Sequence, residues 1–547
     1  MKILDDKMTA NHPHALPEQT STKVTVREAV LQLLRHFNMH LVFGNPGSTE
    51  LPFFRDFPSD FRYVLGLQES VVVGMADGYA QASGNAAFVN LHSAAGVGHA
   101  MGNIFTAYKN NTPIVITAGQ QARSILPFDP FLHSAQATEL PKPYVKWSCE
   151  PARAEDVPLA IARAYYLAMQ EPRGPVFVSI PADDWDRKTD LVSPRAIGMA
   201  SLPDPRILAE IAQALNGSER PAFVVGAGVD RSNAWKETVE LAERHKARVY
   251  VAPMSARCSF PEDHRLFGGF LPAMREKLVD RLAGHDIILV LGAPAFSYHV
   301  EGAGSHVPSG ATLYQIIDDP ATAAWTPTGT AATGNVRLAV QHLLEKSAPR
   351  QRSLPPQREG IPRVAPPPAG EPMSVAYVMQ TLSALRQPSD IVVEEAPSSR
   401  PVIQNYLPMF KSGTFFTMSS GGLGYGLPAA IGVAMAKPKE KVIALIGDGS
   451  SMYAIQALWS AAQLKLPITF LILKNRRYAA LQDFASVFGF EPGASVEGTE
   501  LPDIDFLSLA QGQGCAAVRV EQGDDLHETL LSALRSPVPT LVEIEVA

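Results

Sequence analysis

The chain has 547 residues, enough for three or four globular domains of about 150 residues each. Hydrophobic residues make up 46% of it and charged residues 18%, a balance typical of a protein that buries a core rather than of a disordered one. The net charge of -7, with no basic cluster, gives no electrostatic reason to expect nucleic acid or an anionic membrane as a partner.

The cysteines and the amino terminus indicate the compartment. Cys149, Cys258 and Cys515 are far apart and odd in number, which suits a reducing environment better than a disulfide framework. Asp5 and Asp6 stand where a secretory signal would need an apolar core, and no stretch of about 18 apolar residues follows. We therefore expect a cytoplasmic protein with a disordered tail over residues 1–22.

The first block, residues 23–195, alternates helical patterns with short apolar runs. A helix is predicted over 25–37, because Thr25 and Glu28 form a capping box before residues that are apolar at helical spacing. Strands are predicted at 41–43, 86–91 and 113–119. The alternation is the signature of βαβ units, so we expect an α/β fold with open parallel sheets.

The second block, residues 203–345, repeats this alternation. Strands are predicted in four places, at 221–228, 247–253, 286–294 and 312–317. Residues 347–372 follow, with seven prolines before Glu371 that rule out a helix or a central strand. This segment is predicted to be a linker.

The third block, residues 373–547, contains a polar pair at the ends of two predicted strands. The strands of this block are expected at 390–395, 441–447, 467–475 and 539–546. Asp448 follows one of them, Asn475 ends the next, and one helix is predicted between them over 450–466. Because parallel strands place their carboxyl ends at one edge of a sheet, the two side chains should share that edge.

A carboxylate and a carboxamide at one edge predict a site for a hard cation. Two oxygen ligands and open positions suit Mg²⁺ that also holds phosphate oxygens. The amides of Gly449 and Ser450, which open the helix, would add an anion site. The simpler interpretation, a tight turn after a buried strand, is weakened by the paired Asn475. No P-loop occurs, and the glycines of 226–228 form an incomplete dinucleotide pattern.

The motif from Gly447 to Ser450, followed by Asn475, resembles the diphosphate and metal motif of thiamine diphosphate enzymes. Residues 43–53, 65–84 and 90–102 resemble the amino-terminal domain of the benzoylformate decarboxylases. The likeness covers nearly the whole chain after residue 22. It implies a pyrimidine-binding domain (23–195), a central domain (203–345) and a diphosphate-binding domain (373–547).

The resemblance assigns roles to residues of the cofactor site. Asp448 and Asn475 would bind Mg²⁺, or Ca²⁺ in its place, through their side chains, and Arg477 through its backbone carbonyl. Glu69 matches the carboxylate that contacts the pyrimidine ring and promotes loss of the C2 proton of the cofactor. Leu423 matches the bulky residue that holds the cofactor in its bent form. A core leucine and a helix-opening glutamate are the ordinary interpretations of these two.

Three further residues match positions whose side chains act on the substrate in that family. Ser48 would bind the carboxylate of a 2-oxo acid, although it also suits a helix cap. His92 and His299 match two proton-transferring histidines, whereas His99 matches none. The substrate pocket implied by the resemblance has these members: Ser48, Phe131, Leu132, Pro397, Thr417, Met418, Ala480, Leu481 and Phe484.

Three pocket positions depart from the family pattern. The family has Thr where this chain has Pro397, and Phe-Cys where it has Thr417 and Met418. Thr417, being smaller than Phe, is expected to enlarge the pocket if it faces the substrate. The natural substrate therefore stays open between benzoylformate and another bulky 2-oxo acid.

The resemblance also implies an assembly and a reaction. In that family the cofactor lies between two subunits, so a homodimer is the minimum and a homotetramer is expected. The implied reaction is non-oxidative decarboxylation of a small 2-oxo acid, with carboligation as a side activity. Two alternatives stay open: a carboligase of the acetolactate synthase type, which would carry flavin in the central domain, and a binding protein that kept the fold without the chemistry.

Overall fold

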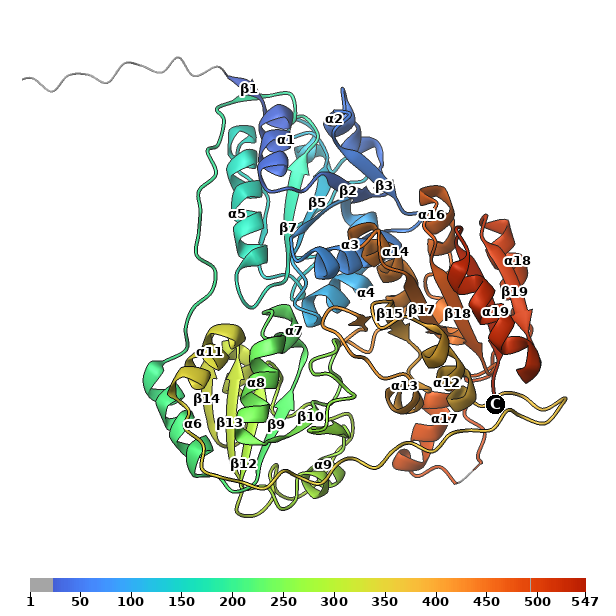
Figure 1. The fold of residues 1–547 in the computed structure, drawn as a ribbon. Coiled ribbons are helices and arrows are strands. Elements are labelled where there is room, and N and C mark those ends of the chain that lie inside the picture. The colour runs from blue at the N-terminus through green and yellow to red at the C-terminus, as the bar shows by residue number, and fades with distance from the viewer. Residues whose placement is uncertain (1–22, 492) are drawn as a thin grey trace, which may run out of the picture.

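The computed structural model describes residues 23–491 and 493–547, and the predicted tail over 1–22 lies outside them. Three parallel sheets of six strands form three α/β units (Figure 1). This confirms the predicted fold class of open parallel-sheet domains. None of the helices within the described ranges combines the length and apolarity needed to cross a bilayer.

The amino-terminal sheet has the order β3-β2-β4-β5-β7-β6. Its strands are β2 (Leu41–Gly44), β3 (Arg62–Leu65), β4 (Ala87–Leu91), β5 (Ile114–Gln120), β6 (Ser148–Cys149) and β7 (Pro175–Pro181). Its helices are α1 (Val26–His36), α2 (Leu51–Phe54), α3 (Glu69–Ser83), α4 (Ser93–Lys109) and α5 (Val157–Met169). The predicted capping box is present: Glu28 N donates to Thr25 Oγ1 at 3.2 Å, and Thr25 N donates to Glu28 Oε2 at 2.7 Å.

The central sheet has the order β11-β10-β9-β12-β13-β14. Its strands are β9 (Pro221–Val225), β10 (Arg248–Val251), β11 (Phe267–Phe270), β12 (Ile287–Leu291), β13 (Thr312–Ile317) and β14 (Thr330–Thr333). Its helices are α6 (Pro205–Gly217), α7 (Ala227–Arg231), α8 (Trp235–His245), α9 (Arg275–Arg281), α10 (Pro320–Ala324) and α11 (Val336–Lys346). The chain order reverses between β9 and β12, so the sheet is wound in both directions from its centre.

The carboxyl-terminal sheet has the order β16-β15-β17-β18-β20-β19. Its strands are β15 (Ile391–Glu395), β16 (Phe415–Phe416), β17 (Val442–Gly447), β18 (Thr469–Lys474), β19 (Ala516–Val520) and β20 (Thr540–Glu545). Its helices are α12 (Val375–Leu385), α13 (Arg400–Tyr406), α14 (Gly426–Ala436), α15 (Asp448–Ser451), α16 (Ala457–Leu464), α17 (Ala479–Ala485), α18 (Phe506–Gly512) and α19 (Gly523–Arg535).

The single helix predicted over 450–466 is wrong. The structure has two helices, α15 and α16, with a turn between them. Ser451 Oγ donates to the Asp448 carbonyl at 2.7 Å, and Ala454 N bonds Ser451 O three residues back, so the first helix stops. The crossover still connects β17 to β18, which pair in parallel as expected.

The outer domains pack through α3 and α14. A Cβ at Gly432 would lie 1.9 Å from the Met75 carbonyl oxygen, and one at Gly78 would lie 2.1 Å from the Ala429 carbonyl oxygen. Only glycine lets the two helix backbones approach this closely. Their apolar residues join one core cluster that spans both domains, from Phe43 to Leu541.

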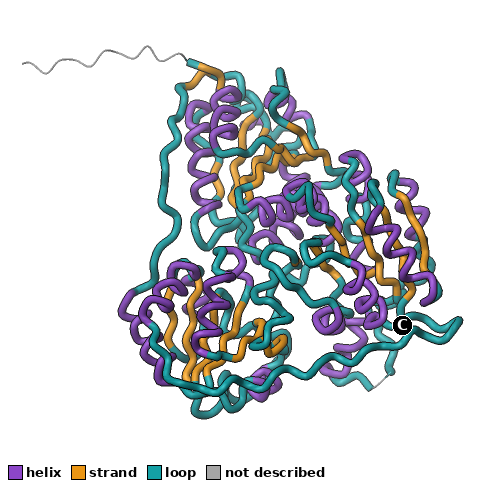
Figure 2. Tube along the Cα trace, viewed as in Figure 1, coloured by secondary structure: helices purple, strands orange, loops and turns teal. Residues whose placement is uncertain are grey.

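The predicted linker, 347–372, contains no helix or strand (Figure 2). It runs along the central domain toward the carboxyl-terminal domain (Figure 1). Arg352 anchors it, with its guanidinium donating to the carbonyls of Leu215, Ser218 and His245. The domain boundaries proposed from the sequence stay predictions.

Candidate functional site

The Asp448 carboxylate is held in place by backbone amides. Oδ1 accepts from Gly449 N at 2.7 Å, and Oδ2 accepts from Asn475 N at 3.0 Å and Arg476 N at 2.6 Å. Arg476 adopts the left-handed region, φ 60°, which turns its N–H toward this oxygen. Burial raises the pKa of Asp448, and the backbone bonds oppose that rise. The side chain therefore has a fixed direction without any ligand.

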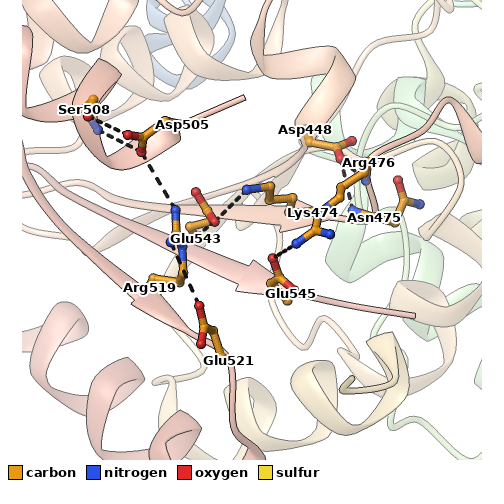
Figure 3. A network of polar contacts seen from close by, with 10 residues as sticks. All are labelled: Asp448, Lys474, Asn475, Arg476, Asp505, Ser508, Arg519, Glu521, Glu543 and Glu545. Carbon is orange, nitrogen blue, oxygen red and sulfur yellow. Dashed lines mark hydrogen bonds and ion pairs between the residues drawn. The ribbon is translucent and has the colours of Figure 1, made fainter. Parts of the chain in front are cut away.

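Asn475 lies beside Asp448 at the joined ends of β17 and β18 (Figure 3). Its Oδ1 accepts from Arg477 N at 3.2 Å, which orients the carboxamide. Farther along the sheet, Glu543 accepts from Lys474 at 2.9 Å and from Arg519 at 2.7 Å (Figure 3). These bonds hold the end of β18, which leads directly into Asn475.

The donor set fits a hard divalent cation. A carboxylate and a carboxamide supply oxygen ligands, and Asp448 Oδ1, with a single amide bond, keeps a lone pair for coordination. No cluster of three histidine, cysteine or acidic side chains suited to a metal occurs in the described part of the chain. Two side-chain ligands with open positions would suit Mg²⁺ that also binds phosphate oxygens.

A buried glutamate holds the segment that carries Leu423. Glu395 accepts from Gly424 N at 2.7 Å and from Gly426 N through its two carboxylate oxygens. Burial raises the pKa of Glu395 to about 8, and these backbone bonds oppose the rise. Leu423 is half-buried against the shared core of the outer domains. Glu395 was not identified from the sequence, where it is only the last residue of a predicted strand.

His299 and α17 form an apolar corner in the part of the molecule that carries Asp448 and Asn475. The rings of His299 and Phe484 lie 4.5 Å apart, so a central-domain residue contacts the carboxyl-terminal domain. Ala480 N donates to Ser398 Oγ at 2.9 Å, which brings the loop after β15, with Pro397, next to α17. Leu481 is 56% exposed. The structure thus brings Pro397, Ala480, Leu481, Phe484 and His299 together.

Thr417 and Met418, two of the predicted pocket residues, directly follow β16. Both are buried inside the chain, at 1% and 2% exposure. The Thr417 hydroxyl donates to Glu394 at 2.9 Å and accepts from Arg400 at 2.7 Å. Within the chain its hydroxyl is thus held by the Glu394–Arg400 ion pair, and the enlargement expected if Thr417 faces the substrate stays a prediction.

At the other end of the chain, a buried glutamate orients His92. His92 Nδ1 lies 2.8 Å from Glu50 Oε2 and 3.1 Å from Thr49 Oγ1. Glu50 also accepts from Gly47 N at 2.8 Å and Gly119 N at 3.0 Å. Because the carboxylate accepts, Nδ1 carries a proton and Nε2 is the ring nitrogen left for other chemistry. Glu50 was missed from the sequence, although it stands two residues after Ser48.

Ser48 and the glycine before it complete this edge. Ser48 is exposed and opens the 3₁₀ turn Ser48–Glu50, whose N-cap residue is Gly47. A Cβ at Gly47 would lie 2.1 Å from the His92 ring, so the absence of a side chain admits the histidine. Ser48 and His92 are thereby brought together, as a substrate-binding pair requires.

Glu69 opens α3 and contacts the histidine to which the resemblance gave no role. Glu69 Oε2 lies 3.1 Å from His99 Nδ1. Its Oε1 would lie 3.2 Å from a Cβ at Gly96, so α4 leaves room for the carboxylate. The Glu69 side chain is 13% exposed and that of His99 is 64% exposed. Sequence reasoning missed this contact, because 30 residues separate the pair.

The two groups of site residues lie apart in one chain. α2, which directly follows Glu50, and α17, which carries Phe484, lie at opposite ends of the molecule (Figure 1). Phe131, another predicted pocket residue, is 85% exposed on the amino-terminal domain, and its neighbour Leu132 is half-buried there. No hydrogen bond or ion pair in the described ranges joins Glu69 or His92 to Asp448 or Asn475.

Comparison with known proteins identifies the family. Models of the thiamine pyrophosphate enzymes match in three parts: the N-terminal TPP binding domain at 24–140, the central domain at 208–343 and the C-terminal TPP binding domain at 398–544. The chain belongs to this thiamine diphosphate-dependent family, as the resemblance implied.

Within this family, the chain is similar over nearly its full length to individual decarboxylases. A benzoylformate decarboxylase of Pseudomonas aeruginosa is 45% identical over 95% of this chain and 98% of its own. The structure of the benzoylformate decarboxylase of Polynucleobacter necessarius matches with a TM-score of 0.93 at 38% identity, over 96% and 98% of the two chains. The 4-hydroxybenzoylformate decarboxylase of Rhodococcus jostii matches at 0.92 and 40%, over 96% and 99%. The chain is thus a homologue of carboxy-lyases.

Proposed function

We propose that this protein decarboxylates a bulky aryl 2-oxo acid, with benzoylformate as the first candidate, using thiamine diphosphate and Mg²⁺. The similarity to a benzoylformate decarboxylase over nearly the full length of both chains carries the proposal. The oriented pairs Asp448 with Asn475 and Glu50 with His92 support it, because a binding protein without chemistry would have no need of them.

The joined ends of β17 and β18, which we call the carboxyl-terminal edge, would hold the cofactor. Asp448 and Asn475 would bind the cation through side-chain oxygens and Arg477 through its carbonyl. Gly449 orients Asp448 through its amide, and the Ser450 amide would be offered to the diphosphate. Gly447 and Leu423 complete the cradle. Thiamine diphosphate, when bound, supplies the electron sink that decarboxylation needs. The protein has to bind, orient and exchange protons around it.

The group of Ser48, Glu50, Glu69 and His92, which we call the amino-terminal edge, would supply the acid–base groups. Glu69 contacts the pyrimidine ring and exchanges a proton with it, while the Ser48 hydroxyl binds the substrate carboxylate. His92 exchanges a proton through Nε2, since Glu50 and Thr49 occupy Nδ1. His299 exchanges the second proton from the opposite edge.

These two edges imply a homodimer at least. Because they lie at opposite ends of one chain, a complete site needs the amino-terminal edge of one subunit against the carboxyl-terminal edge of its partner. The exposed apolar side chains near both edges, among them Phe131 and Leu481, would then be covered. A homotetramer formed by two such dimers is the assembly that we propose.

The apolar corner favours an aromatic substrate over pyruvate. A phenyl ring would bury about 100 Å² more than a methyl group against Phe484 and Leu481, worth about 2.5 kcal/mol at ~25 cal/mol per Å² before losses from fit. That difference is a preference of roughly 70-fold.

A panel of 2-oxo acids tests the function. We would measure carbon dioxide release and kcat/KM for pyruvate, 2-oxobutanoate, phenylpyruvate, benzoylformate and 4-hydroxybenzoylformate, with thiamine diphosphate and Mg²⁺ added. Best turnover of an aryl acid is expected, and best turnover of pyruvate would contradict it. A carboligase of the acetolactate synthase type would instead form a longer product from two pyruvate molecules, and a purified protein carrying flavin would be yellow.

A further inference from the structure

A cavity of about 460 Å³ lies where the three domains meet. It is lined from the amino-terminal domain by residues that include Gln81, Asn111 and Arg173, and from the central domain by Asp230, Arg231 and Arg257. The carboxyl-terminal domain contributes Lys411, Ser412, Lys437 and Glu440. None of the residues assigned above to the cofactor or the substrate lines this junction cavity, so it belongs to a different part of the molecule.

Two ion pairs account for part of the charge around the junction cavity. Arg257 binds Asp230 at 2.6 Å, and Asp230 also accepts from Ser412 Oγ at 2.6 Å. Arg231 lies 3.5 Å from Asp318. Arg257 further donates to Gln81 at 3.1 Å, so a continuous polar chain connects all three domains at the cavity wall.

Three other cations line the cavity and form no ion pair within 4 Å in the described ranges: Arg173, Lys411 and Lys437. Arg173 donates to one neutral group, the Gly84 carbonyl, at 3.2 Å. Burial lowers the pKa of Arg173, and the nearby carboxylates of Glu171 and Asp318 oppose that shift without forming a close ion pair. The one unpaired acid on the wall is Glu440, which is exposed. Positive charge thus predominates on the cavity wall, where five of the lining residues are cations and two, Asp230 and Glu440, are acids.

Several cations around one half-open cavity repel one another until an anion joins them. Burying a charge without a partner costs free energy, and a cleft lined by one sign of charge raises the local concentration of counter-ions. Arginine presents a planar fork of donors that fits a phosphate or carboxylate group, and lysines add point charges. The cavity volume lies within the range usual for small-molecule sites.

We propose that the junction cavity binds a small multivalent anion carrying two or more phosphate or carboxylate groups, held by Arg173, Lys411 and Lys437. The anion contacts all three domains at once and so favours the arrangement in which they meet. It binds independently of the reaction, because the cavity shares no lining residue with the catalytic edges.

Calorimetry on the holoenzyme at low ionic strength tests this proposal. The probes are tricarballylate for carboxylates and 3-phosphoglycerate for the phosphate source, with acetate as the monovalent comparison. We expect saturable binding of one or both multivalent probes, little binding of acetate, and weakening as salt is added. A ligand bound only to the folded form also raises Tm.

Matched variants locate the site. Arg173→Ala and Lys411→Ala should each weaken binding about tenfold or more, and Glu440→Gln should tighten it, because a like charge is removed. Lys439→Ala removes the same charge from an exposed neighbour that does not line the cavity, and it should change nothing. Equal weakening by Lys439→Ala, or no binding of either multivalent probe, would overturn the proposal. The exposed Lys411 and Glu440 keep the test valid if Arg173→Ala folds poorly.

Discussion

The two edges of this molecule are built in different ways. At the carboxyl-terminal edge, backbone amides aim one carboxylate, Asp448, and the strand ends fix its neighbour Asn475. At the amino-terminal edge, a buried side chain, Glu50, aims His92. The first arrangement suits a group that must not move when it binds a cation, and the second suits a ring that must present one chosen nitrogen. The following predictions test this difference, from the largest expected effect to the smallest.

Asp448→Ala should abolish cofactor retention. The variant loses one of two side-chain ligands and leaves the diphosphate charge poorly neutralised. The measurement is thiamine diphosphate affinity by quenching of intrinsic fluorescence, with Mg²⁺ present. Asp505→Ala is the matched control, because Asp505 belongs to the same polar network and caps α18 (Figure 3). Undiminished affinity in the Asp448 variant would remove the metal assignment.

Glu69→Gln should keep the fold and slow exchange of the cofactor C2 proton for deuterium. General acid–base help is worth about 10² to 10⁴ in rate, and an amide does not cycle a proton. Acid quench followed by NMR measures this exchange directly. Exchange at the parent rate would mean that another residue activates the cofactor.

Glu50→Gln should lower kcat by about 10 to 100-fold, and less than His92→Ala does. The amide has the same shape but no longer fixes Nδ1 of His92 as a donor, so the ring loses its preferred tautomer. In the double variant the effects should not add, because Glu50 acts through His92. Glu155→Gln, on the surface of the same domain, is the control. Additive effects would show that Glu50 has a separate role.

Acid should destabilise the central domain. His245 is buried, and burial, with the nearby Arg352 charge, lowers its pKa to about 4 from a usual value near 6.5. Below pH 6.5 the unfolded chain binds this proton more readily than the folded chain does, so stability falls as pH drops from 6.5 toward 4.

The size of this acid effect follows from the same values. Between pH 7 and pH 5 the loss is about 2 kcal/mol at ~1.4 kcal/mol per pKa unit. Urea unfolding at the two pH values measures the loss, and His245→Phe should remove most of it. An unchanged pH dependence in that variant would assign the acid sensitivity to another group.

His99→Ala should have the smallest effect, a loss of about twofold to fivefold in C2 proton exchange. Its contact with Glu69 is solvent-exposed, and exposed pairs contribute about 1 kcal/mol or less. His99→Asn keeps a donor of similar reach and should restore most of the rate. Identical rates in the Ala, Asn and parent proteins would show that the contact does not orient Glu69.

The sequence by itself determined which residues meet at the carboxyl-terminal edge, because the rule used there is general. Parallel strands end on one side of a sheet, so Asp448 and Asn475 had to meet once β17 and β18 were recognised. The α/β class and the capping box at Thr25 followed equally from local pattern. The strand β7 was missed, since prolines at both of its ends, Pro175 and Pro181, resemble loop signals.

Tertiary structure alone decided which side chains meet across long stretches of chain. Glu50 contacts His92 from 42 residues away, His99 contacts Glu69 from 30, and Thr417 bonds Glu394 from 23. The cations of the junction cavity come from three domains. Periodicity reports which face of an element is buried, but not what it is buried against, so these contacts exist only once the sheets and helices are packed.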